Sequence, residues 1–461
     1  MKKFLLPVLL TAAAVCVSWF FQHYTLMCQE YDGLFLWAPD YFRRVLGRPL
    51  PISQALADFL TQFYRFSAWG PWIVGAQVLA VYLLVRMALP GLRELAPTLC
   101  ACGEWLVIAL SPTAKPGIAV LLFAAVFCVV LRLLRKGKAP DGGWAQTWLS
   151  VALIAVFALL VCFLPKVRKT ERWAQVKYGL IFQKGEIALK AATPERVRAD
   201  RELTPFALLA LGETFELSNR LFEYPVYEEN DFDMCLEEDY YNSLFFRAFL
   251  YDALGSGNEA CHQLFQLATQ QEHGTSFMVL RQLVKEYFIL GNYTLAEKYC
   301  KILDRSSTHG KFVAAYRKLM AEGTPREPDT AEESARTKLI SRNPLYNLVR
   351  ISSENPSDFA VDRLLCTFLL QRDLNRFAAL FQASASAPRF ARGVPKVYQE
   401  AMLLYYDEAN VPKGERVLYF SPHTMGAYRR FTQGFVSGEA METQQQRYSD
   451  TYWFYYHYAG Q

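Results

Sequence analysis

Two aspartates in one polar segment are the first candidates for chemistry in this sequence. Asp32 and Asp40 lie in a segment of about residues 22–70 that separates two long apolar runs. A carboxylate can act as a general acid or base, and one held near a membrane could serve an enzyme that acts on a lipid-linked substrate. The alternative, which we favour, is that both aspartates are solvated loop residues.

Other chemical motifs are weak or missing. Asp231-Phe232-Asp233 has the acidic spacing that holds a metal–nucleotide sugar in some transferases, but it lies in a wholly acidic loop, where solvated carboxylates are the simpler interpretation. The sequence contains no G-x-x-x-x-G-K-[ST], G-x-G-x-x-G, H-E-x-x-H, C-x-x-C or G-x-S-x-G pattern. Its histidines are dispersed: His23, His262, His273, His309, His423 and His457. We therefore predict no cofactor and no metal site.

Apolar runs in the first third of the chain predict membrane-spanning helices. The runs cover residues 4–21, 72–89, 97–110, 118–134 and 148–164. Four approach the roughly 20 residues that a helix needs to cross a bilayer, whereas 97–110 is shorter and contains Glu104. About five spans are thus expected within residues 1–165. The mean hydropathy of +0.06 then averages an apolar part and a polar part.

Basic residues suggest which way the spans run. Lys2 and Lys3 at the start, and the cluster from Arg132 to Lys138, favour the cytoplasmic side of the membrane. Five spans satisfy both and leave the C-terminal part outside, although basic residues after Leu164 argue the other way. We expect a multi-pass protein of the bacterial inner membrane, in contact with lipid. The net charge of +5 is too balanced to predict a nucleic-acid partner.

The segment of residues 22–70 predicts an exterior loop with its own helix. Ala57, Phe59, Leu60 and Phe63 alternate with polar residues, as in a short amphipathic helix on a membrane surface. The loop is similar to the first exterior loop of large glycosyltransferases that use lipid-linked sugars, which carries a catalytic acid. That resemblance would assign the acid to Asp32 or Asp40, but those enzymes have many more spans.

Helical periodicity dominates from residue 166 onward and predicts repeated helix pairs. Gly255 and Ala260 in one pair match Gly291 and Ala296 in the next, each 36 residues further along. The glycine permits a tight turn after the first helix, and the alanine allows the second helix to approach closely. We predict an all-α fold, with an α-hairpin solenoid in two blocks at residues 166–323 and 324–461.

Two resemblances extend this interpretation. Residues 290–299, LGNYTLAEKY, resemble the tetratricopeptide repeat family, whose helix pairs bind proteins. Residues 59–64, FLTQFY, and 451–456, TYWFYY, are similar to a group of bacterial polytopic membrane proteins with a tetratricopeptide-like C-terminal domain. No activity is established for that group, so this resemblance implies architecture and location only.

An aromatic cluster near the C-terminus has two interpretations. Tyr452, Trp453, Tyr455 and Tyr456 could form a buried cap on the last helix pair, or an exposed docking patch. Together with the repeats, the cluster favours a membrane-anchored scaffold that binds a protein partner. The alternative is a polytopic, glycosyltransferase-like enzyme that uses Asp32 or Asp40. The sequence favours binding over catalysis.

Overall fold

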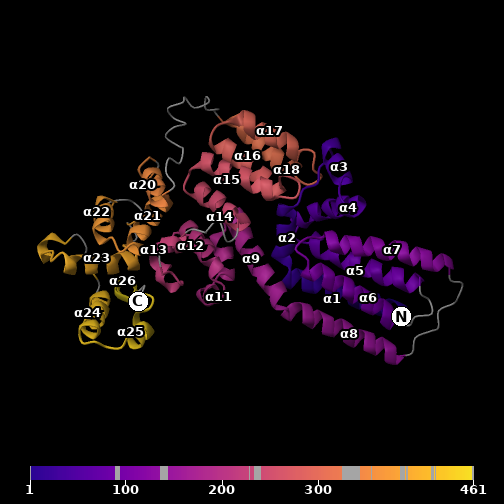
Figure 1. Cartoon of the computed structure of the whole chain (residues 1–461), viewed down its shortest axis with the longest axis horizontal. Coiled ribbons are helices and arrows are strands. Elements are labelled where there is room, and N and C mark those ends of the chain that lie inside the picture. The colour runs from indigo at the N-terminus through magenta and orange to yellow at the C-terminus, as the bar shows by residue number, and fades with distance from the viewer. Residues whose placement is uncertain are drawn as a thin grey trace. The chain divides into compact units, whose positions relative to one another are not determined.

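The structure, a computed structural model, is built from helices. It describes residues 2–88, 94–134, 144–227, 229–232, 240–323, 343–354, 356–384, 390, 393–416, 420 and 422–458. Within these ranges it has 25 α-helices, several short 3-10 helices and no strand (Figure 1). The predicted all-α class is confirmed.

The chain forms two compact units, and each is discontinuous in sequence. The first unit combines Met1–Tyr178 with Ala268–Arg326, and the second combines Gly179–Leu267 with Glu327–Gln461. The division of the chain at residues 165 and 323 stays a prediction from sequence.

Four long apolar helices give the first unit the character of a multi-pass membrane protein. They are α1 (Lys2–Phe21), α5 (Trp69–Ala88), α7 (Lys115–Leu134) and α8 (Trp144–Phe163). The shorter apolar helix α6 (Leu95–Leu110) stands where the fifth span is predicted. At 1.5 Å per residue its 16 residues extend about 24 Å, against the roughly 30 Å of a bilayer's hydrocarbon core.

These five helices pack as one bundle around α5. The helix α5 contacts α1, α6 and α7, and α8 contacts α1 and α6 (Figure 1). Small side chains allow close approach: a Cβ on Gly75 of α5 would lie 2.6 Å from Val15 of α1. The outer faces are apolar too, with Phe123 and Leu133 of α7 strongly exposed. A helix that is apolar on all sides suits lipid as its surroundings.

Short helices fill the segment between α1 and α5. They are α2 (His23–Asp32), α3 (Pro39–Leu46), α4 (Pro51–Thr61) and the 3-10 helix η1 (Gln62–Arg65). The predicted amphipathic helix is α4, and its apolar residues pack against neighbouring residues of the protein. Phe59 packs against Phe35, Trp37 and Phe63, with ring centroids 5.2 to 6.1 Å apart. The periodicity of this stretch therefore reports packing within the protein.

The first unit also contains helices from much later in the chain. They are α16 (Phe277–Ile289), α17 (Tyr293–Leu303) and α18 (Gly310–Glu322), preceded by the end of α15 (Gly257–Gln270). The helices α16 and α17 pack closely as a pair, and α18 contacts both. The helix α16 also contacts α2, so residues more than 240 positions apart share one core. The helix α9 (Pro165–Ile181) continues from α8.

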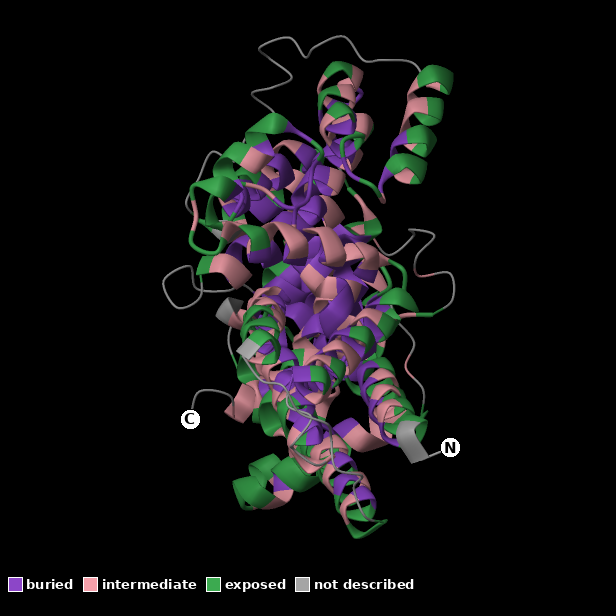
Figure 2. Ribbon diagram, turned by 90° about the vertical axis from the view of Figure 1, so that its right-hand side faces the viewer, coloured by how far each residue is buried: buried purple, intermediate pink, exposed green. Residues whose placement is uncertain are grey.

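The second unit is organised around one fully buried helix, α12 (Thr204–Glu213). Its residues from Thr204 to Gly212 are all buried. It contacts α10 (Gly185–Ala191), α13 (Leu217–Arg220), α14 (Tyr240–Ala253) and α21 (Asp358–Leu370), and α11 (Pro194–Ala199) and most of α15 belong to the same unit. The remaining helices are α20 (Pro344–Glu354), α22 (Leu374–Ser384), α23 (Lys396–Glu408), α24 (Pro422–Val436), α25 (Met441–Tyr448) and α26 (Tyr452–Tyr458). Figure 2 shows the resulting pattern along single helices, buried on one side and exposed on the other.

Candidate functional site

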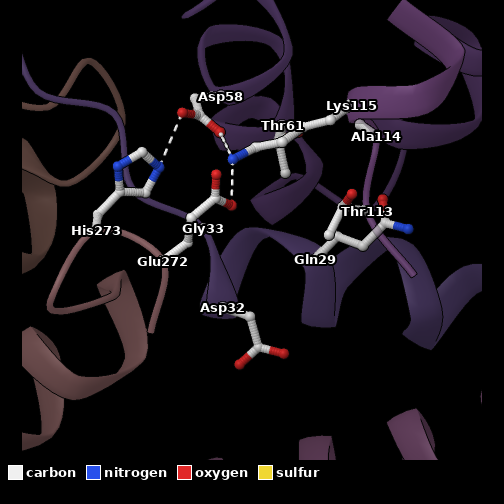
Figure 3. A pocket seen from close by; sticks show the side chains of 10 residues that line it. All are labelled: Gln29, Asp32, Gly33, Asp58, Thr61, Thr113, Ala114, Lys115, Glu272 and His273. Carbon is white, nitrogen blue, oxygen red and sulfur yellow. Dashed lines mark hydrogen bonds and ion pairs between the residues drawn. The ribbon is translucent and has the colours of Figure 1, made fainter. Parts of the chain in front are cut away.

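The two aspartates proposed for catalysis occupy different environments. Asp32 is the last residue of α2 and lines a small polar pocket (Figure 3). Asp40 lies in the first turn of α3 with its side chain 77% exposed, 3.8 Å from Arg43. Asp40 does not line the pocket, so the structure does not bring the two carboxylates together in one site.

The pocket lies where four segments of the first unit meet. It is lined by Gln29, Asp32, Gly33, Asp58, Thr61, Thr113, Ala114, Lys115, Glu272 and His273. Its volume is about 40 Å³, which is room for about three water molecules. Pockets for drug-sized ligands are roughly ten times larger. Among the described residues, no group of three His, Cys, Asp or Glu side chains is placed to hold a metal ion.

Asp58 is the centre of the charge network at this pocket. It is buried and accepts a hydrogen bond of 2.8 Å from the hydroxyl of Tyr41. His273 Nε2 lies 2.9 Å from one of its oxygens and Lys115 Nζ lies 3.5 Å from the other. Lys115 also pairs with Glu272. Figure 3 shows the side chains of Asp58, Glu272 and His273 converging with the tip of Lys115. The network joins α4, the start of α7 and residues 272–273.

Two arginines extend the same contact. Arg48 Nη1 lies 2.7 Å from Glu272, and Arg44 donates a hydrogen bond of 2.8 Å to the carbonyl of His273. Both arginines belong to the stretch between α1 and α5, whereas their partners lie directly before α16. Each charge is therefore matched by a partner from a distant segment.

A second buried cluster joins α2 to the start of α18. Glu30 and His309 have fully buried side chains, and His309 Nε2 lies 3.2 Å from the carboxylate of Glu30. Ser306 Oγ lies 2.9 Å from His309 Nδ1, and Phe277 stacks on the imidazole at 4.2 Å. Burial lowers the pKa of His309, so its ring is neutral at pH 7 and can donate its Nε2 proton to Glu30.

Ser306, His309 and Glu30 are arranged in the order of a hydrolytic serine–histidine–glutamate triad, but their surroundings do not suit catalysis. Ser306 is buried, and its hydroxyl oxygen accepts a hydrogen bond from the backbone N–H of His309. That bond satisfies an amide beside the first turn of α18. A nucleophile needs access to its substrate, and this hydroxyl is enclosed. We interpret the cluster as an internal fastening between α2 and α18.

Backbone groups complete the contact between these distant segments. The N–H of Trp37 donates to the carbonyl of Arg305 at 2.7 Å, and its indole donates to Ser307 at 2.9 Å. The N–H of Phe277 donates to the carbonyl of Gly33 at 3.0 Å. These contacts join residues 30–65 and 115 to residues 272–309. We call this set of contacts the clamp.

Sequence reasoning missed the residues of the clamp. His273 and His309 were visible only as isolated histidines, and Asp58 as a polar position in an amphipathic stretch. Glu171 was missed as well: its carboxylate accepts hydrogen bonds from the backbone N–H groups of Tyr24 and Thr25, both at 2.9 Å, at the start of α2. The available signal was charge beside apolar runs, which does not identify a partner.

The predicted repeat-turn residues lie at helix junctions. Gly255 and Gly291 have φ angles of 73° and 74°, which is left-handed backbone that favours glycine. Ala260 in α15 and Ala296 in α17 are completely buried. The side chain of Asn292 caps α17 by accepting from the N–H of Leu295. These features give α16 and α17 the geometry of a tight helix pair.

The C-terminal aromatic residues are mostly buried in the second unit. Tyr452, Trp453 and Tyr455 are at most 5% exposed, and Tyr456 is half-buried. The indole of Trp453 donates to the carbonyl of Glu400 at 2.8 Å, and the N–H of Tyr452 donates to the Glu400 carboxylate at 2.8 Å. The four residues thus form no exposed docking patch, because three of them are buried. Burial raises the pKa of Glu400 to about 8.

The acidic pair noted in the sequence falls partly within the structure. Asp231 accepts a hydrogen bond of 2.7 Å from the backbone N–H of Tyr227, so its carboxylate serves the local turn. Asp233 lies outside the described residues.

Comparison with known proteins places the whole chain in one family. No curated protein and no solved structure matches it. The model of the Family of unknown function (DUF6057) matches residues 1–185 and 111–459, which together cover nearly every residue. With its four long apolar helices, the chain is a multi-pass membrane protein that belongs to this family.

Proposed function

We propose that this protein is a membrane-anchored scaffold of the bacterial cell envelope, which presents helix pairs to a protein partner. The clamp is the observation that carries the proposal. It fixes α16–α18 to the segment between α1 and α5 through buried polar contacts at Asp58 and Glu30. A helix pair held rigidly on a membrane base loses less conformational entropy on binding than a mobile one.

The pair α16–α17 supplies the binding surface in this proposal. Its turn at Gly291 and its buried Ala296 support the tetratricopeptide-like interpretation. Ile289 at the end of α16 is 56% exposed, and Leu319 on α18 is 45% exposed. Helix-pair repeats bind peptides and proteins along such surfaces.

A photo-crosslinking amino acid at Ile289 and, separately, at Leu319 tests the scaffold in the full-length protein. The proposal expects one and the same protein to be captured from both positions in intact cells. Leu133, 79% exposed on α7, is the matched control and should capture lipid only. Capture of the same species from all three positions, or of none at Ile289 and Leu319, would refute the proposal.

We further propose five membrane crossings with the C-terminal part outside. Three contacts support it by gathering helix ends on one side. The side chain of Gln22, after α1, donates to the carbonyl of Ala109 near the end of α6, and Lys115 at the start of α7 pairs with Asp58. Glu171 after α8 binds the start of α2. For α5 and α7 both to start on this side, α6 must return the chain across the bundle.

Labelling from one side of the membrane tests the topology. Lys301→Cys on α17, an exposed position, should react with a membrane-impermeant maleimide in intact cells. Lys136→Cys, between α7 and α8, should react only after permeabilisation. The reverse pattern would place the C-terminal part in the cytoplasm and contradict the five-crossing proposal.

An enzyme acting on a lipid-linked substrate remains the second candidate, because Asp32 lines a polar pocket beside the bundle. The volume of about 40 Å³ counts against it, since no sugar fits there without rearrangement. The variant Asp32→Asn preserves size and removes the charge. If the protein is a scaffold, Asp32→Asn and Asp40→Asn should both complement a deletion strain fully. Failure of Asp32→Asn alone, at normal expression, would favour the enzyme.

A further inference from the structure

One buried acid in the bundle has no role in the clamp. Glu104 lies on α6, six residues before its end, so it is about 9 Å from that end along the helix axis. Its side chain is 2% exposed, and neither carboxylate oxygen has a hydrogen-bond partner among the described residues. An ionisable group at such a position is costly and usually marks an ion or proton site.

The space beside Glu104 is built from three helices. Gln77 of α5 is buried, and Gly117 of α7 packs close to α6. A Cβ placed on Gly117 would lie 2.7 Å from Ile108 Cγ1, 3.4 Å from Glu104 Oε1 and 3.5 Å from Gln77 Oε1. Two oxygen acceptors from different helices therefore face the same small region. The glycine lets α7 approach α6 closely here, and the side chain of Ile108 bounds the same region.

No cation of the protein occupies this position among the described residues. The charged residues of the neighbouring helices are used elsewhere: Arg86 lies 3.0 Å from Glu94, Lys115 pairs with Asp58, and Arg132 donates to the carbonyl of Met87. The other titratable side chains on the surrounding elements are tyrosines and cysteines, which never carry a positive charge: Tyr64, Tyr82, Cys100, Cys102, Cys128 and Cys162. Gln77 also carries an amide Nε2 that is buried without a partner, but a neutral amide cannot balance the charge of a carboxylate. The counter-charge for Glu104 must therefore come from outside the described part of the chain.

We propose that Glu104 and Gln77 form a binding site for a monovalent cation, a proton or Na⁺, inside the membrane bundle. With a proton, Glu104 becomes a neutral carboxylic acid that can donate to Gln77 Oε1, and release of the proton restores the carboxylate. With Na⁺, both oxygens become ligands and the charge is neutralised without protonation. The site is independent of the scaffold proposal, because α16–α18 take no part in it.

Infrared difference spectroscopy of the full-length protein in lipid nanodiscs tests the site. The wild-type spectrum minus that of Glu104→Gln isolates the carbonyl band of a protonated Glu104. In choline buffer the band should be present at low pH and disappear as pH rises. At a fixed pH where the band persists, added Na⁺ should abolish it if Na⁺ is the ion and leave it unchanged if the site takes protons only.

Two results would overturn the proposal. A carbonyl band that responds to neither pH nor Na⁺ would show a permanently neutral structural acid. No carbonyl band at any pH in choline buffer, together with no change of the Glu104 carboxylate bands on addition of Na⁺, would show an acid that binds neither ion. Glu94→Gln, which removes an acid paired with Arg86, is the matched control and should leave the Glu104 band unchanged. Glu104→Gln keeps the size of the side chain, and its thermal unfolding midpoint establishes that the variant is folded.

Discussion

Replacing Asp58 by alanine should loosen α16–α18 from the membrane-proximal segment. The change removes the acceptor of the Tyr41 hydroxyl, at 2.8 Å, and the carboxylate oxygen that lies 2.9 Å from His273 Nε2. It leaves Lys115 with Glu272 alone. Removing one partner of a buried pair costs about 3–5 kcal/mol. Because Lys115 keeps a partner, we expect about 3 kcal/mol, at the lower end.

A matched control comes from the other aspartate of the same segment. Asp40 is 77% exposed and makes one ion pair, at 3.8 Å. Such surface pairs contribute roughly 0–1 kcal/mol. In a unit of this size, 1 kcal/mol corresponds to about 2–4 °C in Tm. We therefore expect Asp58→Ala to lower Tm by roughly 6–12 °C, and Asp40→Ala by less than about 4 °C.

Hydrogen exchange locates the effect that thermal unfolding measures. In Asp58→Ala, the amides of α16–α18 should exchange faster than in the wild type, because local opening becomes less costly. Those of α23 and α26, in the second unit, should be unchanged. A Tm equal to that of Asp40→Ala would refute the clamp. So would a lower Tm whose faster exchange lies only outside residues 268–326.

Three further predictions concern buried groups and close packing. Burial raises the pKa of Glu400 to about 8, so Glu400 binds its proton more tightly in the folded state than in the unfolded chain. The free energy of unfolding should therefore fall as pH rises from about 4.5 to 8, by at most about 1.4 kcal/mol per pH unit. Glu400→Gln should flatten this slope in melts recorded from pH 5 to 8. For His309, whose pKa burial lowers, stability should instead be lost as pH falls below about 6.5, and His309→Gln should reduce that loss in exchange measurements on α18. Gly75→Leu should cost about 1–3 kcal/mol by overpacking, since even a Cβ there lies 2.6 Å from Val15; Gly103→Leu, where a Cβ meets nothing within 4 Å, should leave Tm nearly unchanged.

The membrane helices could be predicted because a single local property identifies them. The apolar runs at residues 72–89 and 148–164 correspond to α5 and α8, but both helices begin earlier, at Trp69 and Trp144. Composition marks only the segment that suits the hydrocarbon core. The backbone hydrogen bonds continue into the polar boundary, where tryptophan is favoured.

The helix pair at Gly291 was also accessible from sequence, because the turn and the close contact require particular residue types. The segments that pack against this helix pair could not be predicted from the sequence. Nothing in residues 272–309 indicates that they share a core with residues 30–65, because a buried ion pair has no periodicity. Lys115 and Asp58 are 57 positions apart, and each is an ordinary charged residue until the fold brings them to 3.5 Å. Long-range polar contacts of this kind are specified by the whole packing arrangement.

Buried polar groups in the first unit thus fall into two kinds, and the difference decides their interpretation. In the clamp, each buried charge meets a group from a distant segment: Asp58 meets Lys115, and Glu30 meets His309. Such pairs fix one element against another and need no ligand. Glu104 is equally buried, yet neither of its carboxylate oxygens has a hydrogen-bond partner among the described residues. Because the clamp pairs its buried acids, we expect something else to neutralise this one, and the cation proposed for Glu104 and Gln77 would do so.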